Sequence, residues 1–264
     1  MAPVLPLNRV LSVPNCNMMK KIGLNLARFL SRERHAHRAT PPTTPDRLLA
    51  CLEPVDVLLV EGNSQISTAI KYLTQSTWSH AALYVGAYGG GRLTQSTHCF
   101  IEADLIEGVR SVSIEAFAGV PTRICRPVGL SEEERRAVIE FAIARLGHRY
   151  DLKNVVDLAR YLLPTPPVPT RIRRRMIAFG SGDPTRAICS TLIAEAFQFV
   201  HYPVLPAVEY RSAATKDCPE CIDEIMHIRH HSLFVPRDFD VSPYFRIVKP
   251  TIEGEFDFRT LKWS

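Results

Sequence analysis

Residues 64–86 read SQISTAIKYLTQSTWSHAALYVG, a helix pattern followed directly by a strand pattern. Ser64 is a residue type that favours helix N-termini, and apolar residues then return at helical spacing as far as Leu73. We therefore expect a helix that begins after Ser64 and has one apolar face. The following segment, WSHAALYVG (Trp78–Gly86), has the short apolar character of a strand.

His80 lies within this strand pattern. Side chains alternate along a strand, so His80 shares a face with Ala82 and Tyr84, while the residues between them face the core. Small neighbours leave room for a second side chain to approach the imidazole. Taken alone, a histidine at this place is more simply interpreted as a surface or core-edge residue.

Further β segments lie in the first half of the chain. VDVLLV (Val55–Val60) is apolar enough for a buried strand, and HCFIEAD (His98–Asp104) is another strand pattern. The segments GVRSVSI and TRICRP, residues 108–114 and 122–127, continue the β region. A glycine-rich turn at 88–92 separates the second strand from the third. An antiparallel sheet is therefore expected here.

The second half is mainly helical. Ser131 and Glu134 have the spacing of a capping box, and Gly147 suits the end of the helix that follows. Further helices are expected over 151–163 and from the turn at 180–184 to Val200. From Val204 on, the pattern predicts irregular chain with one short strand at Phe245–Val248. The fold class is α+β, with an antiparallel sheet packed with helices.

Residues 1–47 are interpreted as an N-terminal tail, and residues 48–264 as one domain. Within the tail, residues 20–38 have the pattern of an amphipathic helix, with basic side chains beside an apolar stripe. We favour a helix that docks on the body of the protein. The alternative is a weak contact with a membrane surface.

Composition limits the functional class. The net charge of +5 is mild, and no basic stripe is interleaved with aromatic residues, so we expect no nucleic-acid partner. The seven cysteines are an odd number and are mostly far apart, which argues against a disulfide framework and favours a reducing compartment. The sequence shows no apolar run of membrane-spanning length and no signal peptide. A cytoplasmic location is therefore expected, with peripheral membrane contact as the alternative.

Cys189 lies near the start of a helix pattern, AICSTLIAEAFQFV (Ala187–Val200), just after polar, turn-forming residues. Unpaired backbone N–H groups and the helix dipole favour negative charge at such a place, which lowers the pKa of a thiol and makes it nucleophilic. An arbitrary cysteine is nevertheless more often a structural residue of the core.

Glu102 lies in the strand pattern FIEAD, on the same face as Phe100 and Asp104. If this strand pairs with that of His80 across the glycine-rich turn, Glu102 can lie beside the imidazole and orient it. The register of the pairing cannot be derived from the sequence. The simpler interpretation is a solvated glutamate on an exposed face.

Three segments together carry a family resemblance: residues 64–86, FIEADLIEGVRSVSIEAF (100–117) and ICSTLIAEAFQ (188–198). In combination they resemble the permuted papain-like hydrolases related to NlpC/P60, in particular the YiiX/YebB-like branch. The order His, Glu, Cys is that of the permuted branch. The resemblance covers about residues 50–200.

The resemblance implies a circularly permuted papain-like fold and a catalytic triad. Cys189 matches the nucleophile, His80 the general base and Glu102 the orienting residue. Tyr150 and Asp151 resemble a family segment that lines the substrate cleft. The implied reaction is cleavage of an amide bond through a thioester acyl-enzyme, and no cofactor is expected.

The segment from Cys218 to His231 contains residue types that could bind a metal ion. Cys218 and Cys221 form a CxxC followed by three histidines, His227, His230 and His231. This spacing fits no known zinc finger, because the histidines lie too close to Cys221 and to one another. We expect no metal, and histidines that interact with acidic groups or water.

Three functions remain open at this level. The first is a cysteine amidase or peptidase acting on a small acyl-amide or peptide-like substrate. The second is a lipid acyltransferase or phospholipase, which the basic helix at 20–38 and the arginine run at 171–175 would favour. The third is a binding module with an inactive triad, against which the intact His80, Glu102 and Cys189 argue. The oligomeric state cannot be derived.

Overall fold

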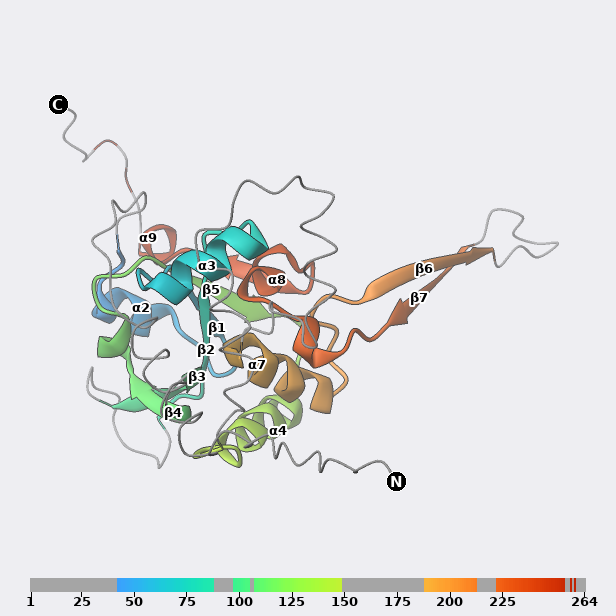
Figure 1. The fold of residues 1–264 in the computed structure, drawn as a ribbon, viewed down its shortest axis with the longest axis horizontal. Coiled ribbons are helices and arrows are strands. Elements are labelled where there is room, and N and C mark those ends of the chain that lie inside the picture. Colours follow the sequence, from blue (N-terminus) through green and yellow to red (C-terminus); the bar gives the residue numbers. More distant parts are fainter. Residues whose placement is uncertain are drawn as a thin grey trace, which may run out of the picture.

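The computed structural model describes residues 42–87, 97–104, 107–148, 188–212 and 222–254, together with 257 and 259. A six-stranded antiparallel sheet forms its centre, and helices lie on both sides of it (Figure 1). The α+β class expected from the sequence is confirmed. Among the described residues, no helix is long and apolar enough to cross a membrane.

The strand order in the sheet is β4-β3-β2-β1-β5-β8. Every pair of neighbours in it is antiparallel. Strand β8 lies near the end of the described chain, and it pairs with β5 at one edge of the sheet. The bounds are β1 Val57–Val60, β2 His80–Tyr84, β3 His98–Asp104, β4 Gly108–Ser113, β5 Thr122–Pro127 and β8 Phe245–Val248. The strands expected at 98–104 and 245–248 are confirmed to the residue.

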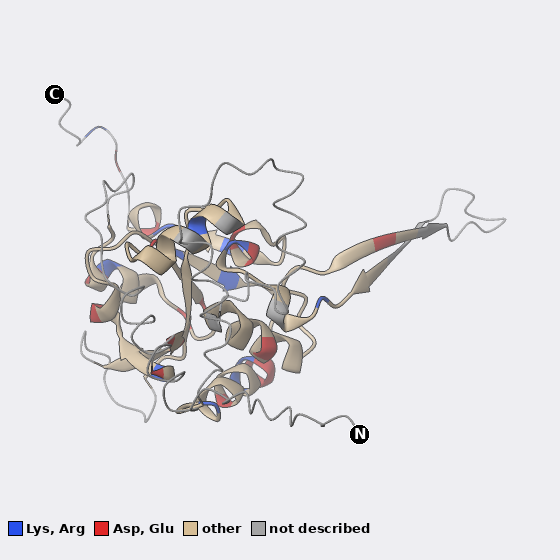
Figure 2. Ribbon diagram, in the orientation of Figure 1, with Lys and Arg blue, Asp and Glu red and all other residues tan. Residues whose placement is uncertain are grey.

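The helices begin where their capping residues predict. Ser64 accepts a hydrogen bond from the backbone N–H of Ser67 at the start of α3, and Ser131 and Glu134 form the expected capping box of α4. Gly147 has φ +82°, a left-handed conformation that suits the turn after that helix. The helices are α2 Pro45–Cys51, α3 Gln65–Thr74, α4 Glu132–Ile143, α7 Ile188–Phe199, α8 Pro236–Val241 and α9 Pro250–Glu253, with 3₁₀ turns η1 Ile114–Phe117 and η2 His231–Leu233. Acidic and basic residues follow one another along α4 (Figure 2), with three glutamates in its first turn, where the helix dipole favours them.

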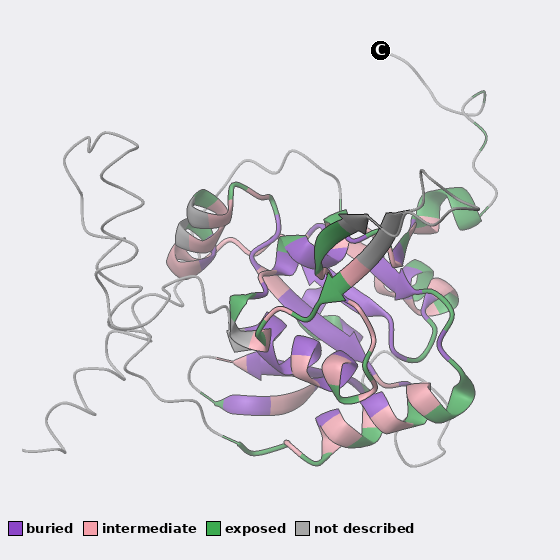
Figure 3. Cartoon of the chain, turned by 90° about the vertical axis from the view of Figure 1, so that its right-hand side faces the viewer, coloured by how far each residue is buried: buried purple, intermediate pink, exposed green. Residues whose placement is uncertain are grey.

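Both faces of the central sheet are buried. Helix α7 packs on the face that carries Ala81 and Leu83, and its apolar side chains join one core cluster with them. The opposite face carries Ala82 and Tyr84, which belong to a second cluster with side chains from α2 and η1. The alternation expected along β2 is therefore present, but the face of His80 is covered as well. Figure 3 shows buried residues in both the sheet and α7.

The expectation of irregular chain after Val204 is wrong. Strands β6 (Ala207–Ser212) and β7 (Ile222–His227) form a two-stranded ribbon that projects from the body (Figure 1), and α8 follows it. The two strands pair only with each other in the described structure, so neither shows the apolar pattern of a core strand. Helix α2 spans Pro45–Cys51, and the boundary between tail and domain after residue 47 stays a prediction.

A buried ion pair fixes β5 to the start of β1. Asp56 is fully buried, and Arg126 binds it through two parallel contacts, Nε to Oδ1 at 2.9 Å and Nη2 to Oδ2 at 2.8 Å. Burial raises the pKa of Asp56, and the guanidinium opposes that shift. Arg126 also contacts Glu53, so a single guanidinium holds the segment between α2 and β1 against the sheet.

Candidate active site

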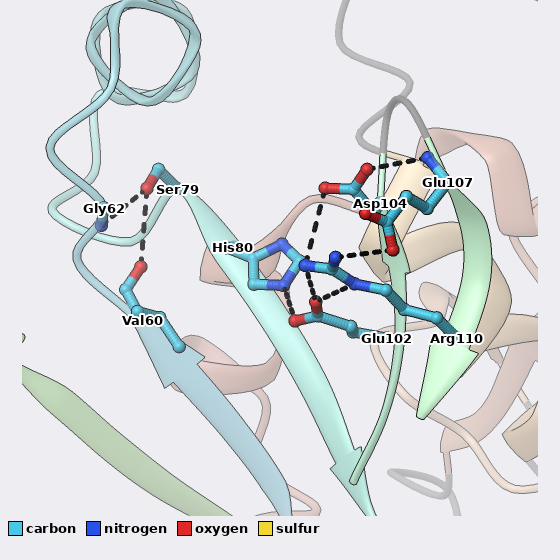
Figure 4. A network of polar contacts seen from close by, with 8 residues as sticks. All are labelled: Val60, Gly62, Ser79, His80, Glu102, Asp104, Glu107 and Arg110. Carbon is cyan, nitrogen blue, oxygen red and sulfur yellow. Dashed lines mark hydrogen bonds and ion pairs between the residues drawn. The ribbon is translucent and has the colours of Figure 1, made fainter. Parts of the chain in front are cut away.

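His80 and Glu102 meet across the pairing of β2 and β3. Ala82 lies opposite Glu102 in this register, so His80, two residues earlier, is the diagonal neighbour of Glu102 on the same face. The His80 Nε2 atom lies 2.7 Å from Glu102 Oε2 (Figure 4). The Glu102 side chain is only 5% exposed, against 26% for His80. The interpretation of Glu102 as a solvated glutamate is therefore wrong, because β3 is an inner strand.

Cys189 lies in the first turn of α7, as its sequence pattern predicts. Its thiolate accepts hydrogen bonds from the His80 ring and from the backbone N–H groups of Ala81 and Ser190. Since His80 Nε2 is engaged by Glu102, Nδ1 is the ring nitrogen left for Cys189. The structure thus brings Cys189, His80 and Glu102 together in one row.

The first turn of α7 is anchored from two sides. Ser190 is fully buried and donates from Oγ to the carbonyl oxygen of Phe234 at 2.8 Å. Farther along the helix, Ile193 and Phe197 are fully buried in the core cluster. These contacts fix the position of Cys189 relative to the sheet, so its distance from His80 does not depend on a surface loop.

The charges of Cys189 and His80 support each other. Burial alone would raise the pKa of the Cys189 thiol, but the charge and hydrogen bond of His80, with two backbone N–H groups, lower it. Burial likewise opposes the charged imidazole, yet Cys189 and Glu102 together raise the pKa of His80 well above its usual value. Both shifts favour a thiolate beside an imidazolium, the reactive form of a nucleophilic cysteine.

The chain order His, Glu, Cys on this fold agrees with a comparison against known families. Residues 52–161 match the model of a family described as the permuted papain-like amidase enzyme, YaeF/YiiX, C92 family. The matched residues, which make up less than half of the chain, are similar to the permuted papain-like amidases. The resemblance noted in the sequence and the fold it implies are both confirmed. A comparison with curated proteins found no match.

The range that matches the permuted papain-like amidases runs from the end of α2 past α4. It contains His80 and Glu102, whereas Cys189 lies beyond its end. The geometry, rather than the family match, is therefore what connects Cys189 with the other two residues.

Glu102 has a second partner that the sequence analysis missed. Arg110 on β4 donates from Nε to Glu102 Oε1 at 2.9 Å. Burial would raise the pKa of Glu102, but hydrogen bonds and charges from His80 and Arg110 lower it to about 2. Glu102 is therefore a carboxylate at any physiological pH. The pattern GVR after a strand gave no sign of this contact, because it depends on the register of β3 and β4.

A serine and a glycine hold the start of β2 next to His80. The Ser79 hydroxyl accepts a hydrogen bond from the Gly62 N–H at 2.9 Å and donates to the carbonyl oxygen of Val60 at 3.4 Å (Figure 4). A Cβ atom on Gly62 would lie 2.3 Å from Ser67 Oγ and 2.9 Å from Ser79 Oγ. Only a glycine allows this close approach between the loop after β1 and the residue that precedes His80.

Trp78 connects the same segment to α8. Its Nε1 donates to Asp240 Oδ2 at 3.0 Å, and Arg123 on β5 binds Asp240 Oδ1 at 2.6 Å. The Arg123 guanidinium also lies over the Trp78 ring, 4.9 Å from its centroid. Helix α8, which the sequence analysis did not predict, is in this way joined to the strand that carries His80.

Tyr150 and Asp151, the expected substrate-binding residues, lie outside the described residues, as do Cys218 and Cys221. His227 binds Glu209 at 2.8 Å and His231 binds Glu195 at 3.0 Å, so these two histidines do interact with acidic groups. Within the described ranges, no group of three or more His, Cys, Asp or Glu side chains could hold a metal ion.

Proposed function

We propose that this protein is a cysteine-dependent amidase or peptidase that cleaves an amide bond through a thioester acyl-enzyme. The observation that carries the proposal is the row Cys189–His80–Glu102, in which each residue is hydrogen-bonded to the next. The lowered pKa of Cys189 supports a nucleophilic thiolate. The family description as amidase enzymes supports the choice of an amide.

In the first half-reaction the Cys189 thiolate attacks the carbonyl carbon, and the carbonyl oxygen becomes an oxyanion. Backbone N–H groups at the start of α7, including that of Cys189, are suited to stabilise this charge. His80 carries the proton that the leaving amine needs, and it passes that proton to the nitrogen as the C–N bond breaks. The products of this step are a thioester on Cys189 and a free amine.

In the second half-reaction the neutral His80 removes a proton from water, and the resulting hydroxide equivalent attacks the thioester. The C–S bond breaks, the carboxylic acid is released, and Cys189 returns to the thiolate beside a protonated His80. Glu102 remains ionised throughout, because its pKa of about 2 is far below that of the imidazole. Its role is to hold the imidazole in one tautomer and orientation.

The free thiols favour a reducing location for this chemistry. Cys51, Cys99, Cys125 and Cys189 are free cysteines in the described structure. An acyl-enzyme on Cys189 requires its thiol to stay reduced, so we propose that the protein works in a reducing compartment such as the cytoplasm.

Labelling with activity-based probes tests the reaction class. Thiol-reactive probes built on a peptide-like amide and on a lipid acyl chain are offered in parallel, and the modified residue is mapped by mass spectrometry. The amide probe is expected to label Cys189, and Cys189→Ala to abolish labelling. Cys99 is the matched internal control, because burial raises its pKa to about 11.

The other outcomes separate the alternatives. Labelling of Cys189 by the lipid probe alone would replace the amidase with a lipid acyltransferase or phospholipase of the same fold. Absence of labelling by both probes, in folded protein, would favour a binding module. Equal labelling of Cys189 and Cys99 would mean that Cys189 has no special reactivity.

A further inference from the structure

Arg110 lies directly opposite Glu102 in the pairing of β3 and β4. Two of its guanidinium nitrogens reach the same carboxylate oxygen, Nε at 2.9 Å and Nη2 at 2.7 Å from Glu102 Oε1. The other oxygen, Oε2, is the one bound to His80. Each oxygen of Glu102 thus has its own cationic or hydrogen-bonding partner, and His80 and Arg110 both contact the carboxylate (Figure 4).

The guanidinium is itself held by two further carboxylates. Its Nη1 donates to Glu107 Oε2 at 2.9 Å, and its Nη2 lies 3.7 Å from Asp104 Oδ2. Burial opposes the charge of Arg110, but the hydrogen bonds and charges of Glu107, Glu102 and Asp104 raise its pKa further above the usual range. Arg110 is therefore a permanent cation in a fixed orientation. Of its three carboxylate partners in the described structure, Glu102 is the one that binds His80.

We propose that Arg110 is a positioning residue of the amidase site, which keeps Glu102 ionised and directs its Oε2 atom at His80. This inference rests on the proposed function. It follows from two physical features. A carboxylate with one oxygen bound is free to rotate about its terminal torsion, whereas the fork of Arg110 fixes the other oxygen and stops that rotation. A buried carboxylate near Asp104 and Glu107 would also take up a proton more readily if the guanidinium were absent.

If Arg110 served only to hold β3 and β4 together, its loss would have a different effect. Removal of a purely structural Arg110 would lower the free energy of unfolding and leave the titration of Cys189 unchanged. Loss of a positioning residue would weaken the support that Glu102 gives to the imidazolium, and this would in turn weaken the support that His80 gives to the thiolate. The pH dependence of Cys189 reactivity therefore distinguishes the two roles.

The experiment is the pH profile of iodoacetamide modification of Cys189 in the full chain, followed by mass mapping. In Arg110→Met the midpoint is expected to move to higher pH by about one unit, the size of shift that one close opposite charge produces. Arg110→Lys keeps the charge without the fork and should recover most of that shift. Glu107→Gln is the matched control, because it removes a partner of Arg110 that does not touch Glu102, and its profile should follow the wild type.

The outcomes are separable. If folded Arg110→Met has the wild-type midpoint, the positioning role is wrong. If Arg110→Met does not fold, the uncharged variant Arg110→Gln decides: a midpoint above that of the wild type supports the role, and an identical midpoint overturns it. If Cys189 of the wild type already titrates like a free thiol, the proposed function itself fails, and this result is distinct from any effect of Arg110.

Discussion

The Nε2 atom of His80 lies 2.7 Å from Oε2 of Glu102, and the two residues lie on neighbouring strands of one sheet. Their separation is set by backbone pairing, since the register places Ala82 opposite Glu102. A site built on paired strands keeps its geometry better than one built on loops. The orientation of the imidazole is therefore a property of the sheet.

The first prediction concerns the pH dependence of the reactive cysteine. The pKa of the Cys189 thiol is lowered and that of the His80 imidazole is raised, and both shifts favour an ion pair between the two residues. Reactivity should rise as pH passes upward through the pKa of Cys189, and turnover should fall as His80 loses its proton at higher pH. Iodoacetamide modification should already be rapid near neutral pH. A single midpoint near the free-thiol value of about 8.5 would contradict the ion pair.

The second prediction ranks the members of the triad. Cys189→Ala should abolish acyl-enzyme formation and leave the fold intact, because a small side chain fits the same helix position. His80→Ala should lower kcat/KM by roughly 10²–10⁴-fold, the usual contribution of a general acid–base, and move the Cys189 pKa toward about 8.5. Glu102→Gln should cost less, since an amide still hydrogen-bonds to the ring. Steady-state kinetics with an amide substrate measure kcat/KM for each variant. A larger loss of kcat/KM in Glu102→Gln than in His80→Ala would contradict this ranking.

Local sequence patterns predicted the elements that carry the site, and they did so for physical reasons. The strand at His98–Asp104 and the capping box of Ser131 and Glu134 are encoded within a few residues, by alternation and by hydrogen-bonding side chains. The position of Cys189 in the first turn of its helix is local in the same sense. His80 and Glu102 were identified through the family resemblance, and their approach required a strand register that no single segment contains.

What the sequence did not predict is mostly long-range. Arg110 contacts Glu102 because two strands pair in one register, and Asp240 meets Trp78 across 162 positions of the chain. Neither side chain has a distinctive local pattern. Strands β6 and β7 were also missed, because they pair with each other away from the sheet and expose apolar side chains such as Tyr210 and Met226.

The third prediction concerns the buried pair of Asp56 and Arg126. Arg126→Met should lower the free energy of unfolding by about 3–5 kcal/mol, because it leaves the fully buried Asp56 without its cation. The double variant Asp56→Asn with Arg126→Met should recover part of the loss, since the amide carries no charge. Urea unfolding measures both. Equal stability of the single and double variants would show that the buried charge is not the cause.

The same variants provide a control for the active site. Asp56 and Arg126 make no contact with Cys189, His80 or Glu102 among the interactions of the described residues. The iodoacetamide profile of folded Arg126→Met should therefore follow the wild type. A shifted midpoint would mean that general loosening of the sheet is enough to change Cys189.

The last prediction concerns Gly62, whose N–H donates to the hydroxyl of Ser79 beside His80. Gly62→Ala would place a Cβ atom 2.3 Å from Ser67 Oγ and 2.9 Å from Ser79 Oγ, so these two side chains or the loop after β1 must shift. Overpacking of this kind typically costs about 1–3 kcal/mol of stability. Because Ser79 precedes His80, the displacement should also lower kcat/KM with an amide substrate.

A second substitution tests whether the clash is the cause. Ser67→Ala removes the nearest oxygen, but the Ser67 Cβ at 3.1 Å and Ser79 Oγ remain. The double variant Gly62→Ala with Ser67→Ala should therefore regain part of the lost stability and activity, relative to Ser67→Ala alone. Thermal unfolding and steady-state kinetics are measured on all three variants. If Gly62→Ala is as stable and active as the wild type, the close approach of this loop to Ser79 does not hold His80 in place.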